Sequence, residues 1–535
     1  MKHLLLLAAF ALWSALATAQ TRTVSGTIRD AAGQPLPGVA IVVPGTTHGT
    51  VTDLDGHYTI TVDGAQKLTA SFIGYLSSDI DLAAGQTDAT LQEENKEMDE
   101  VIVVAYGTST KGTYTGSAAQ VGAEKLEKRQ VSNASQALTG TMAGVQTLSV
   151  DGQPGTSATI RVRGAGSINA EMDPLIIVDG MPFDGDLSSI NTNDIESMTV
   201  LKDAASTALY GARGANGIIM ITTKKGKKGD AKINFEARWG ANTRQVENYD
   251  VLKSPGEYME RLYTAYYNAF LYNEDLGKDI AHVYANDAIM DGGIGKGYQI
   301  YTVPDGETLV GADGKLNPNA KLGYSDGKYY YTPDDWEEET FKRQNRQQYD
   351  LSIAGGTDNF NYFFSLGYIN DGGVIPNSAF ERLSTRLKVD YQAKKWLKVG
   401  ANAAYSHSKS RKPGEQQSIN STGNAFFIAN FIAPVYPLYV RNADGSFMYD
   451  NGRRVYDYGD GKSSNGNRQW MSIANPLGDL TYNKEVYQHD IFNGGLSADI
   501  TPIKGLTLTA KYGIYVDNER GDMLSNAYMG QSAAY

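Results

Sequence analysis

Histidine is the side chain best suited to acid–base and metal chemistry at neutral pH. The six histidines of this chain lie far apart in the sequence. They are His3, His48, His57, His282, His407 and His489. Their spacing matches no zinc-binding pattern, and the chain has no nucleophile elbow, phosphate-binding loop or zincin helix. Carboxylates are plentiful, but no pair is distinguished by its position. The sequence therefore predicts no catalytic residue, metal ion or cofactor, and we expect that the protein is not an enzyme.

Two short motifs match ligand-binding loops only in part. Asp53 and Asp55 lie in DLDGHY, like the first carboxylates of a calcium loop, but the further carboxylates and the closing glutamate are missing. A plain turn is the better interpretation. Residues 164–166, GAG, are not followed by the third glycine of a dinucleotide-binding loop. Neither motif indicates a bound ion or nucleotide.

One stretch has the composition of a docking strand. In MDEVIVVAYGT, residues 98–108, the β-branched run Val101 to Val104 lies between the charged segment EENKEMDE and the small polar segment TSTKGTYTGS. The run has no neighbour in sequence with which it could pair. It therefore either joins a distant sheet or receives a strand from another protein along its edge. By itself the run favours a core strand, whereas the segments on either side favour docking.

The chain begins with an export signal. Lys2 and His3 precede the apolar run LLLLAAFALW, and residues 17–19, ATA, fit the small-x-small rule for cleavage. We therefore expect residues 1–19 to be a signal peptide. Because the chain contains no cysteine, it has neither disulfides nor the thiol that lipid attachment requires. No later apolar run reaches the length of a transmembrane helix, so a membrane form would have to be a β-barrel.

The composition favours strands and argues against nucleic acid. The 535 residues include 58 glycines and 34 tyrosines, which is typical of many turns and aromatic-edged strands. The net charge of −12 argues against a nucleic-acid partner, because phosphate neutralisation needs a concentrated basic face. We expect an all-β dominated fold.

The first two folded segments are predicted to differ in class. Residues 20–95 alternate short strands with turns, such as the hairpin at Asp55-Gly56, and predict a small β-sandwich. Residues 110–228 predict an α+β domain with strands such as TIRVRGAGS and a hairpin at Asp179-Gly180. Two helices are expected in it. One begins at Ser132 or Asn133 and ends at Gly144, and an Ala-rich helix after Lys202-Asp203 is capped by Gly211.

Residues 229–535 predict the first strands of a large antiparallel transmembrane β-barrel. Seven amphipathic strands are expected, near INFEARWGA, YDLSIAG, NYFFSLGYI, STRLKVDYQ, WLKVGANAAYSH, IFNGGLSADI and LTLTAKYGIYV. Their connections alternate between long and short, as periplasmic turns and external loops do in such barrels. A soluble sandwich is the alternative, but it has no reason for this alternation. Because seven strands cannot enclose a domain of this size, we expect this segment to be the truncated N-terminal part of a barrel.

The long loops carry the candidates for substrate contact. SPGE at 254–257 starts a predicted helix whose apolar stripe we assign to packing. The aromatic clusters further along could stack on sugar rings or peptide side chains, although packing within the loops is an equal alternative. The candidates are Tyr330, Trp336, Tyr436 and Tyr439.

Four of these segments, in this order, resemble the SusC/RagA-type TonB-linked outer-membrane transporters. SGTIRDAAGQPLPGVAIVV is similar to the carboxypeptidase-regulatory-like domain, and residues 96–109 are similar to the TonB box with its linker. Three further segments resemble the plug domain of this family: VRGAGSIN, PLIIVDGMP and VLKDAASTALYGARGANGIIMITTKKG. The signal peptide at the start is the fourth of these segments, and the strands after residue 229 resemble the family in character.

The resemblance implies TonB-dependent uptake of glycans or peptides across the bacterial outer membrane. It implies that the energy transducer TonB binds the box, and that a SusD-like surface lipoprotein and membrane lipid are further partners. The TonB-binding residues would be Asp99, Glu100, Val101, Ile102, Val103, Val104 and Ala105. A TonB-linked receptor or signal transducer and a secreted β-domain adhesin are the alternatives.

Overall fold

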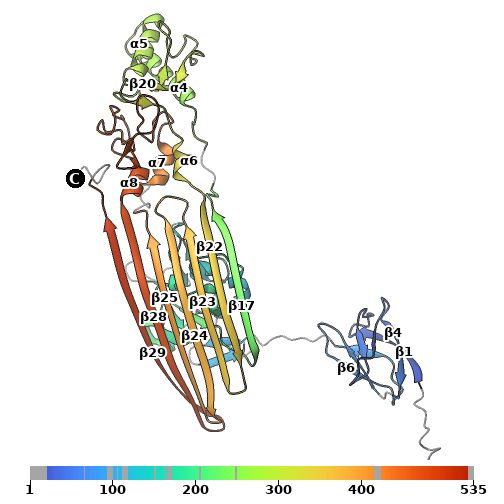
Figure 1. Ribbon diagram of the computed structural model, residues 1–535. Helices are drawn as coiled ribbons and strands as arrows, with labels where there is room; N and C mark the ends of the chain where they lie inside the picture. Colours follow the sequence, from blue (N-terminus) through green and yellow to red (C-terminus); the bar gives the residue numbers. More distant parts are fainter. Residues whose placement is uncertain are drawn as a thin grey trace, which may run out of the picture. The chain divides into compact units, whose positions relative to one another are not determined.

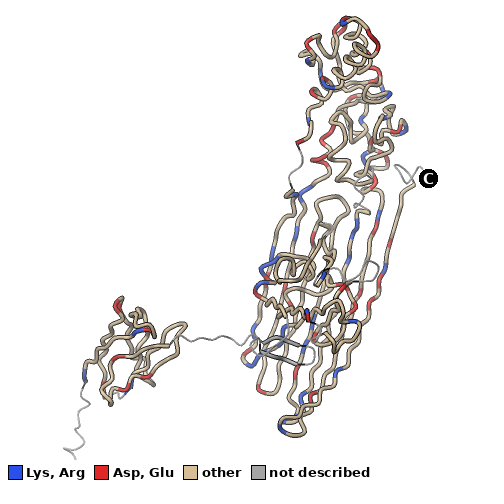
Figure 2. The backbone as a smooth tube through the Cα atoms, turned by 180° about the vertical axis from the view of Figure 1, so that it is seen from behind, with Lys and Arg blue, Asp and Glu red and all other residues tan. Residues whose placement is uncertain are grey.

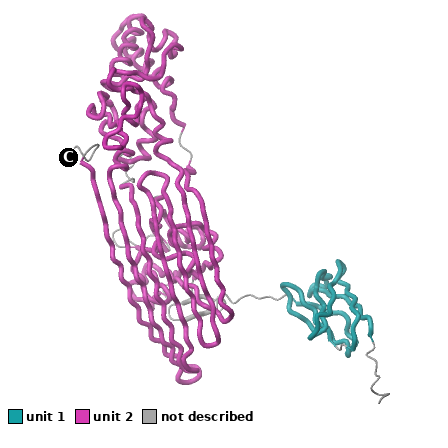
Figure 3. The backbone as a smooth tube through the Cα atoms, in the orientation of Figure 1, with its two compact units in different colours: residues 1–101, 110–114 teal, residues 102–109, 115–535 magenta. Residues whose placement is uncertain are grey.

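Figure 1 shows the computed structural model of the protein. It describes most of the chain that follows the predicted signal peptide, residues 1–19. The described residues are 21–64, 67–92, 101–104, 107–110, 118–149, 152–162, 164, 172–203, 207–246, 250–414 and 423–527. The chain divides into two units (Figure 3), residues 1–101 with 110–114, and residues 102–109 with 115–535. Each unit has a hydrophobic core of its own.

The first unit is a β-sandwich, as predicted. Its two sheets have the strand orders β4-β1-β7 and β3-β2-β5-β6. The strands are β1 Thr21–Asp30, β2 Ala40–Val42, β3 Gly49–Val51, β4 His57–Asp63, β5 Lys67–Ser71, β6 Ser78–Asp81 and β7 Ala89–Leu91. Alternate side chains of β4 enter the core. Asp53 accepts hydrogen bonds from the backbone N–H groups of Asp55 (3.0 Å) and His57 (2.8 Å), which makes this segment a turn.

The plug, at the start of the second unit, is built on a mixed five-stranded sheet of order β10-β15-β16-β13-β14, with a separate hairpin β11-β12. The strands are β10 Ala118–Gly122, β11 Val145–Leu148, β12 Thr159–Val162, β13 Leu175–Val178, β14 Met181–Pro182, β15 Ile195–Leu201 and β16 Ile218–Thr223. The helical segments are α2 Ala123–Glu127, η1 Gln136–Leu138, η2 Leu187–Ser189, η3 Thr192–Asp194 and η4 Ala208–Gly214. Val121, Met198 and Ile219 lie in one core with residues of both sheets.

The two predicted plug helices are shorter than expected. Between Ser132 and Gly144 only η1 is helical, because the Asn133 carboxamide accepts hydrogen bonds from the backbone N–H (2.9 Å) and hydroxyl (2.8 Å) of Ser135, which stabilise a turn. The Ala-rich segment contains η4, and Gly211 interrupts it at φ 60° instead of capping its end. The predicted Asp179-Gly180 hairpin is confirmed, with φ of 52° and 85°, as a type I′ turn requires.

The seven predicted wall strands are confirmed as one antiparallel sheet whose order follows the chain. They are β17 Gly229–Asn242, β22 Gln344–Gly356, β23 Phe360–Gly372, β24 Ala379–Lys394, β25 Leu397–Arg411, β28 Lys484–Ile503 and β29 Leu506–Leu524. The fold is therefore a β-sandwich, an α+β plug and a large sheet that does not close in this structure.

The connections of the wall alternate in length as predicted. Short turns at 357–359, 395–396 and 504–505 lie at one end of the sheet in Figure 1. The longer connections at the other end are 243–343, 373–378 and 412–483. This places the two long loops together.

The wall face turned away from the plug carries an apolar band between two rows of aromatic side chains. Side chains such as Phe235, Leu366 and Leu387 are exposed within the band. At one edge the indole N–H of Trp239 donates to the Tyr349 hydroxyl (3.0 Å), and at the other the ring of Phe360 packs edge-on against Tyr391. An apolar band bordered by aromatic girdles is the pattern of a lipid-facing sheet.

The two long loops fold together into a region with two hydrophobic clusters. Its helices are α4 Pro255–Asn268, the π-helical turn η5 Ala269–Asn273, α5 Lys278–Met290, α6 Trp336–Thr340, α7 Ala425–Phe431 and α8 Pro476–Tyr482. Its two-residue strands are β18 Tyr301–Thr302, β19 Lys321–Leu322, β20 Tyr324–Ser325, β21 Tyr330–Tyr331, β26 Tyr449–Asp450 and β27 Arg453–Arg454. The predicted start of α4 is confirmed, because the Ser254 hydroxyl accepts from the N–H of Glu257 (3.2 Å). Within the described ranges, no helix is long and apolar enough to cross a membrane.

One carboxylate of this region is placed to titrate near neutral pH. Asp479, in α8, accepts a hydrogen bond from the Tyr458 hydroxyl (3.2 Å). Burial raises the pKa of Asp479 to about 6 and outweighs that hydrogen bond, which lowers it. Because the folded pKa lies above the ordinary value, the loop region loses stability as the pH rises towards 6.

We expect Asp479→Asn to stabilise the loop region at about pH 8 by about 2 kcal/mol and to have no effect at about pH 4. Asparagine does not ionise, and its carbonyl oxygen can still accept from Tyr458. Hydrogen exchange of residues 412–483 at the two pH values measures the difference. Asp313→Asn, at an exposed loop carboxylate, is the control, and an equal effect at both pH values would contradict the prediction.

Candidate functional site

The candidate docking strand forms a hairpin with the residues that follow it. Val101–Val104 is β8, and it pairs with β9, Gly107–Thr110, in a two-stranded sheet. The prediction that β8 has no partner nearby in sequence was therefore wrong, because the short polar segment after it contains β-branched threonines that suit a strand. Of the other candidate residues, Asp99, Glu100 and Ala105 lie outside the described residues. A two-stranded hairpin alone is marginally stable, so its pairing can be exchanged at low cost.

The plug is held against the wall by a column of basic side chains on β24. Because side chains alternate along a strand, Arg382, Arg386 and Lys388 share the face that the plug covers. The side chains of Arg386 and Lys388 are 6% and 16% exposed, and Arg382 is 4% exposed as a residue, so all three are withdrawn from water. Buried charges of this kind must find partners.

Arg382 finds its partners on the plug backbone. Its guanidinium donates to the carbonyl oxygens of Ser188 (2.5 Å), Ile190 (3.1 Å) and Ser132 (3.3 Å). These carbonyls belong to two plug segments, before η1 and around η2, so one side chain joins both segments to the wall. All three bonds come from Nη1 of Arg382.

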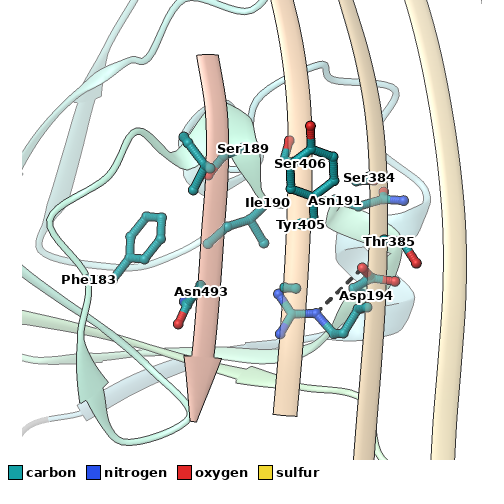
Figure 4. A pocket seen from close by; sticks show the side chains of 13 residues that line it. Phe183, Ser189, Ile190, Asn191, Asp194, Ser384, Thr385, Tyr405, Ser406 and Asn493 are labelled. Carbon is teal, nitrogen blue, oxygen red and sulfur yellow. Dashed lines mark ion pairs between the residues drawn. The ribbon is translucent and has the colours of Figure 1, made fainter. Parts of the chain in front are cut away.

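Arg386 pairs with Asp194 at the end of η3. The pair has an N–O distance of 3.6 Å and is marked by the dashed line in Figure 4. Burial raises the pKa of Asp194, and Arg386 opposes that rise. A cavity beside the pair is lined by polar side chains of plug and wall, including Asn191, Ser384 and Ser406 (Figure 4).

Lys388 pairs with Asp179 at the tip of the β13–β14 hairpin. Its ammonium lies 2.9 Å from the Asp179 carboxylate, which also accepts from the N–H (3.0 Å) and hydroxyl (2.6 Å) of Thr223. Burial acts to raise the pKa of Asp179, but Lys388, Arg386 and the hydrogen bonds of Thr223 together outweigh burial and lower it. Asp179 is therefore a stable anion that ties the hairpin both to β16 and to the wall.

The same hairpin enters a gap that two wall glycines leave. Gly495 of β28 and Gly513 of β29 are paired in register. A Cβ at Gly495 would lie 2.3 Å from the Met181 methyl carbon, and one at Gly513 would lie 2.3 Å from the Met181 sulfur. Beside them, the ring of Phe183 packs edge-on against Tyr515 with centroids 5.2 Å apart. Any side chain larger than hydrogen at either glycine would displace Met181.

A third anchor uses plug amides. The Nδ2 groups of Asn191 and Asn193 donate to the two carboxylate oxygens of Asp350 on β22, at 2.7 and 2.6 Å. Gly367 of β23 leaves room for this contact, because a Cβ there would lie 2.2 Å from Asn191 Nδ2. Together these contacts bind the plug to β22, β24, β28 and β29. They form a docking interface, and in the described parts of the chain no group of three or more His, Cys, Asp or Glu could hold a metal ion.

The aromatic candidates for substrate contact lie mostly inside the loop region. Trp336, Tyr436 and Tyr439 are 3%, 4% and 6% exposed. The Trp336 indole donates to the Tyr436 carbonyl (3.0 Å), the Tyr436 hydroxyl to the Ile294 carbonyl (2.7 Å), and the Tyr439 hydroxyl to Glu339 (3.0 Å). Tyr330 is partly exposed, in β21. In this conformation the first three side chains pack the loops together and present no open ring face.

Sequence reasoning missed the basic column of β24. In RLSTRLKV the alternate positions 382, 386 and 388 are basic, and that signal was available. A polar inward face is, however, ordinary for such a strand, so the pattern does not reveal that the plug supplies the partners.

Comparison with known proteins agrees with this architecture. Residues 110–218 match the TonB-dependent Receptor Plug Domain family, and residues 24–103 match the CarboxypepD_reg-like domain family. The chain is 32% identical over 515 residues to the TonB-dependent receptor SusC of Bacteroides thetaiotaomicron, covering 93% of this chain and 44% of SusC. It is 30% identical over 508 residues to the TonB-dependent receptor P26 of Formosa agariphila, covering 94% and 44%.

Among solved structures, the RagAB peptide importer in its "open-open" state is similar at 29% identity and a TM-score of 0.57. The match covers 79% of this chain and 43% of that one. The chain thus spans less than half the length of the curated relatives that it matches.

We expect Asp179→Asn to weaken the seating of the plug by about 3 kcal/mol or more, because it leaves Lys388 buried without a counter-charge. Adding Lys388→Met should restore most of the loss, since both charges are then removed. Hydrogen exchange of β13–β16 in the two single variants and the double variant measures the coupling. Strictly additive effects would refute the ion pair as an anchor.

We expect Gly513→Val to unseat the β13–β14 hairpin, because the valine side chain would occupy the space of Met181. Limited trypsin digestion of the outer-membrane protein should then cleave the plug faster. Gly240→Val is the matched control, since a Cβ at this wall glycine meets nothing within 4 Å. Equal cleavage of the two variants would rule out the glycine gap as a docking site.

Proposed function

This chain belongs to the SusC/RagA-type TonB-dependent transporters, and we propose that it serves in energised uptake of glycans or peptides across the bacterial outer membrane. The observation that carries the proposal is the plug seated on one face of a sheet whose other face has the pattern of a lipid-facing wall. A wall of this kind admits cargo only when the plug moves. In the proposal, residues 1–19 direct export, and a SusD-like surface lipoprotein and the energy transducer TonB are the partners.

The energy that moves such a plug must come from outside the outer membrane, because this membrane has no ATP and no ion gradient of its own. The proposed entry point is the TonB box, Asp99 to Ala105, with β8 as the pairing strand. A strand of TonB replaces β9 or adds to the other edge of β8, and its backbone hydrogen bonds then bear load together. The marginal stability of the β8–β9 hairpin favours this exchange.

A pull on β8 acts next on β10, the following strand of the plug. Among the described residues, β10 lies at the edge of the plug sheet and pairs with β15 alone, over Ala118–Gly122. Glu127, at the end of α2, is joined to Lys224 by an ion pair. An edge strand of this kind can be withdrawn first, and further load then reaches the anchors on β24 that hold β13 to β16.

We expect Val103→Pro to abolish energised uptake while the protein still reaches the outer membrane and folds. Proline removes a backbone N–H that the paired strand needs. Val103→Thr, which keeps the N–H and the β-branched shape, should retain uptake. The measurement is growth or tracer uptake that depends on the protein and on TonB. Normal uptake by the proline variant would refute the docking role of β8.

A further inference from the structure

Four basic side chains of the wall depend on the plug for their partners. Lys511 of β29 donates to the backbone carbonyl of Asp179 (3.4 Å), beside the β24 column of Arg382, Arg386 and Lys388. Within the described parts of the chain, all hydrogen-bond and ion-pair partners of these four are plug atoms. These partners are carboxylates, backbone carbonyls and one hydroxyl.

Other basic residues of the wall have acidic partners on the wall itself. Figure 2 shows acidic and basic residues interspersed along its strands. Arg238 pairs with Glu236 on the same strand at 2.5 Å. Lys398 pairs with Asp390 on the adjacent strand at 3.5 Å, and Arg346 with Asp371 at 3.9 Å. These cations keep an acidic partner whether the plug is present or not. In the β24 column, Arg382 also interacts electrostatically with the wall carboxylate Asp350, whereas among the described residues the ion-pair and hydrogen-bond partners of Arg386, Lys388 and Lys511 lie on the plug.

Movement of the plug would leave the column without acceptors. Removing one partner of a buried charge is costly, because the remaining charge keeps its desolvation penalty. A cargo that enters the space of the plug and brings acceptors of its own reduces that cost. The column would then favour cargo that resembles what it now holds.

The groups that the β24 column now binds belong to a polypeptide chain. Arg382 binds three backbone carbonyls, and Arg386 and Lys388 each bind an aspartate carboxylate. Arg386 and Lys388 are two residues apart on one strand, about 7 Å, which is also the repeat between alternate side chains of an extended peptide. Charge and spacing therefore both suit an extended peptide with acidic side chains.

We propose that the cargo of this protein is an acidic peptide, whose carboxylates bind the β24 column and Lys511 in place of Asp179 and Asp194. This inference rests on the proposed uptake function and narrows its substrate class. It requires no covalent step.

The first test compares depletion of a mixed digest by cells that carry the native gene and by cells from which it is deleted. The digest contains protein fragments and fragments of neutral and uronate-rich polysaccharides, separated by anion exchange and identified by mass spectrometry. Gene-dependent loss of acidic peptides ahead of neutral and basic peptides is expected. Loss of neutral peptides or of glycans, with acidic peptides left behind, would overturn the inference and leave the uptake function intact. No gene-dependent loss of any fraction would overturn both.

The second test separates cargo binding from plug anchoring with two variants that break the same ion pair. Lys388→Gln removes the wall cation, whereas Asp179→Asn removes its plug partner. The uptake ratio of an Asp-rich peptide to its Asn-substituted counterpart should fall about tenfold in Lys388→Gln, the loss of about one charged contact. The ratio should stay unchanged in Asp179→Asn, although total uptake falls with the lost anchor.

Lys511→Gln provides a variant in which folding is not in question, because Lys511 is exposed and makes one long contact, to a plug carbonyl. It should lower the same ratio, by less than Lys388→Gln does. An equal change of the ratio in Lys388→Gln and Asp179→Asn, or no change in either lysine variant, would show that the basic side chains serve the plug alone.

Discussion

The plug depends on the desolvated positive charge of one wall strand. Arg382, Arg386 and Lys388 are withdrawn from water, and among the described residues their hydrogen-bond and ion-pair partners belong to the plug, so seating the plug and supplying these partners are one event. A buried charge tolerates few alternative geometries. This fixes the position of the plug more strictly than an apolar contact of similar size would, because apolar contacts are not directional.

Apolar contacts between plug and wall accompany these polar anchors, and a Cβ at Gly155 of the plug would lie 2.2 Å from the ring of the buried wall residue Phe380. The plug has a core of its own, which Tyr515 of the wall joins as a partly buried side chain. Met181 fits a gap between glycines and fills no larger pocket. The core of the plug is its own, and water can satisfy the polar groups of the anchors, so plug and wall can separate without unfolding that core.

Much of the fold was predictable from the sequence, because its signals are local. The period-two pattern of the wall strands, the alternating loop lengths, the Asp179-Gly180 turn and the Ser254 cap each follow from a few neighbouring residues. The failures come from tertiary context. The strand partner of β8 was missed because the Gly-Thr-Ser-Thr segment is small and polar, a composition that is typical of linkers. The helix expected after Ser132 was displaced by turns whose hydrogen bonds outweigh propensity. The docking interface was not predictable, since the residues of each contact lie up to several hundred positions apart.

The pairing of Gly495 with Gly513 has a consequence for how the wall is assembled. Side chains on a strand alternate between faces, so a shift of one residue in β28 and β29 would turn Leu496 and Tyr512 towards the plug and the glycines towards lipid. Met181 would then meet a bulky side chain where the gap should be. The plug can therefore seat as observed only on a wall whose β28 and β29 are in this register.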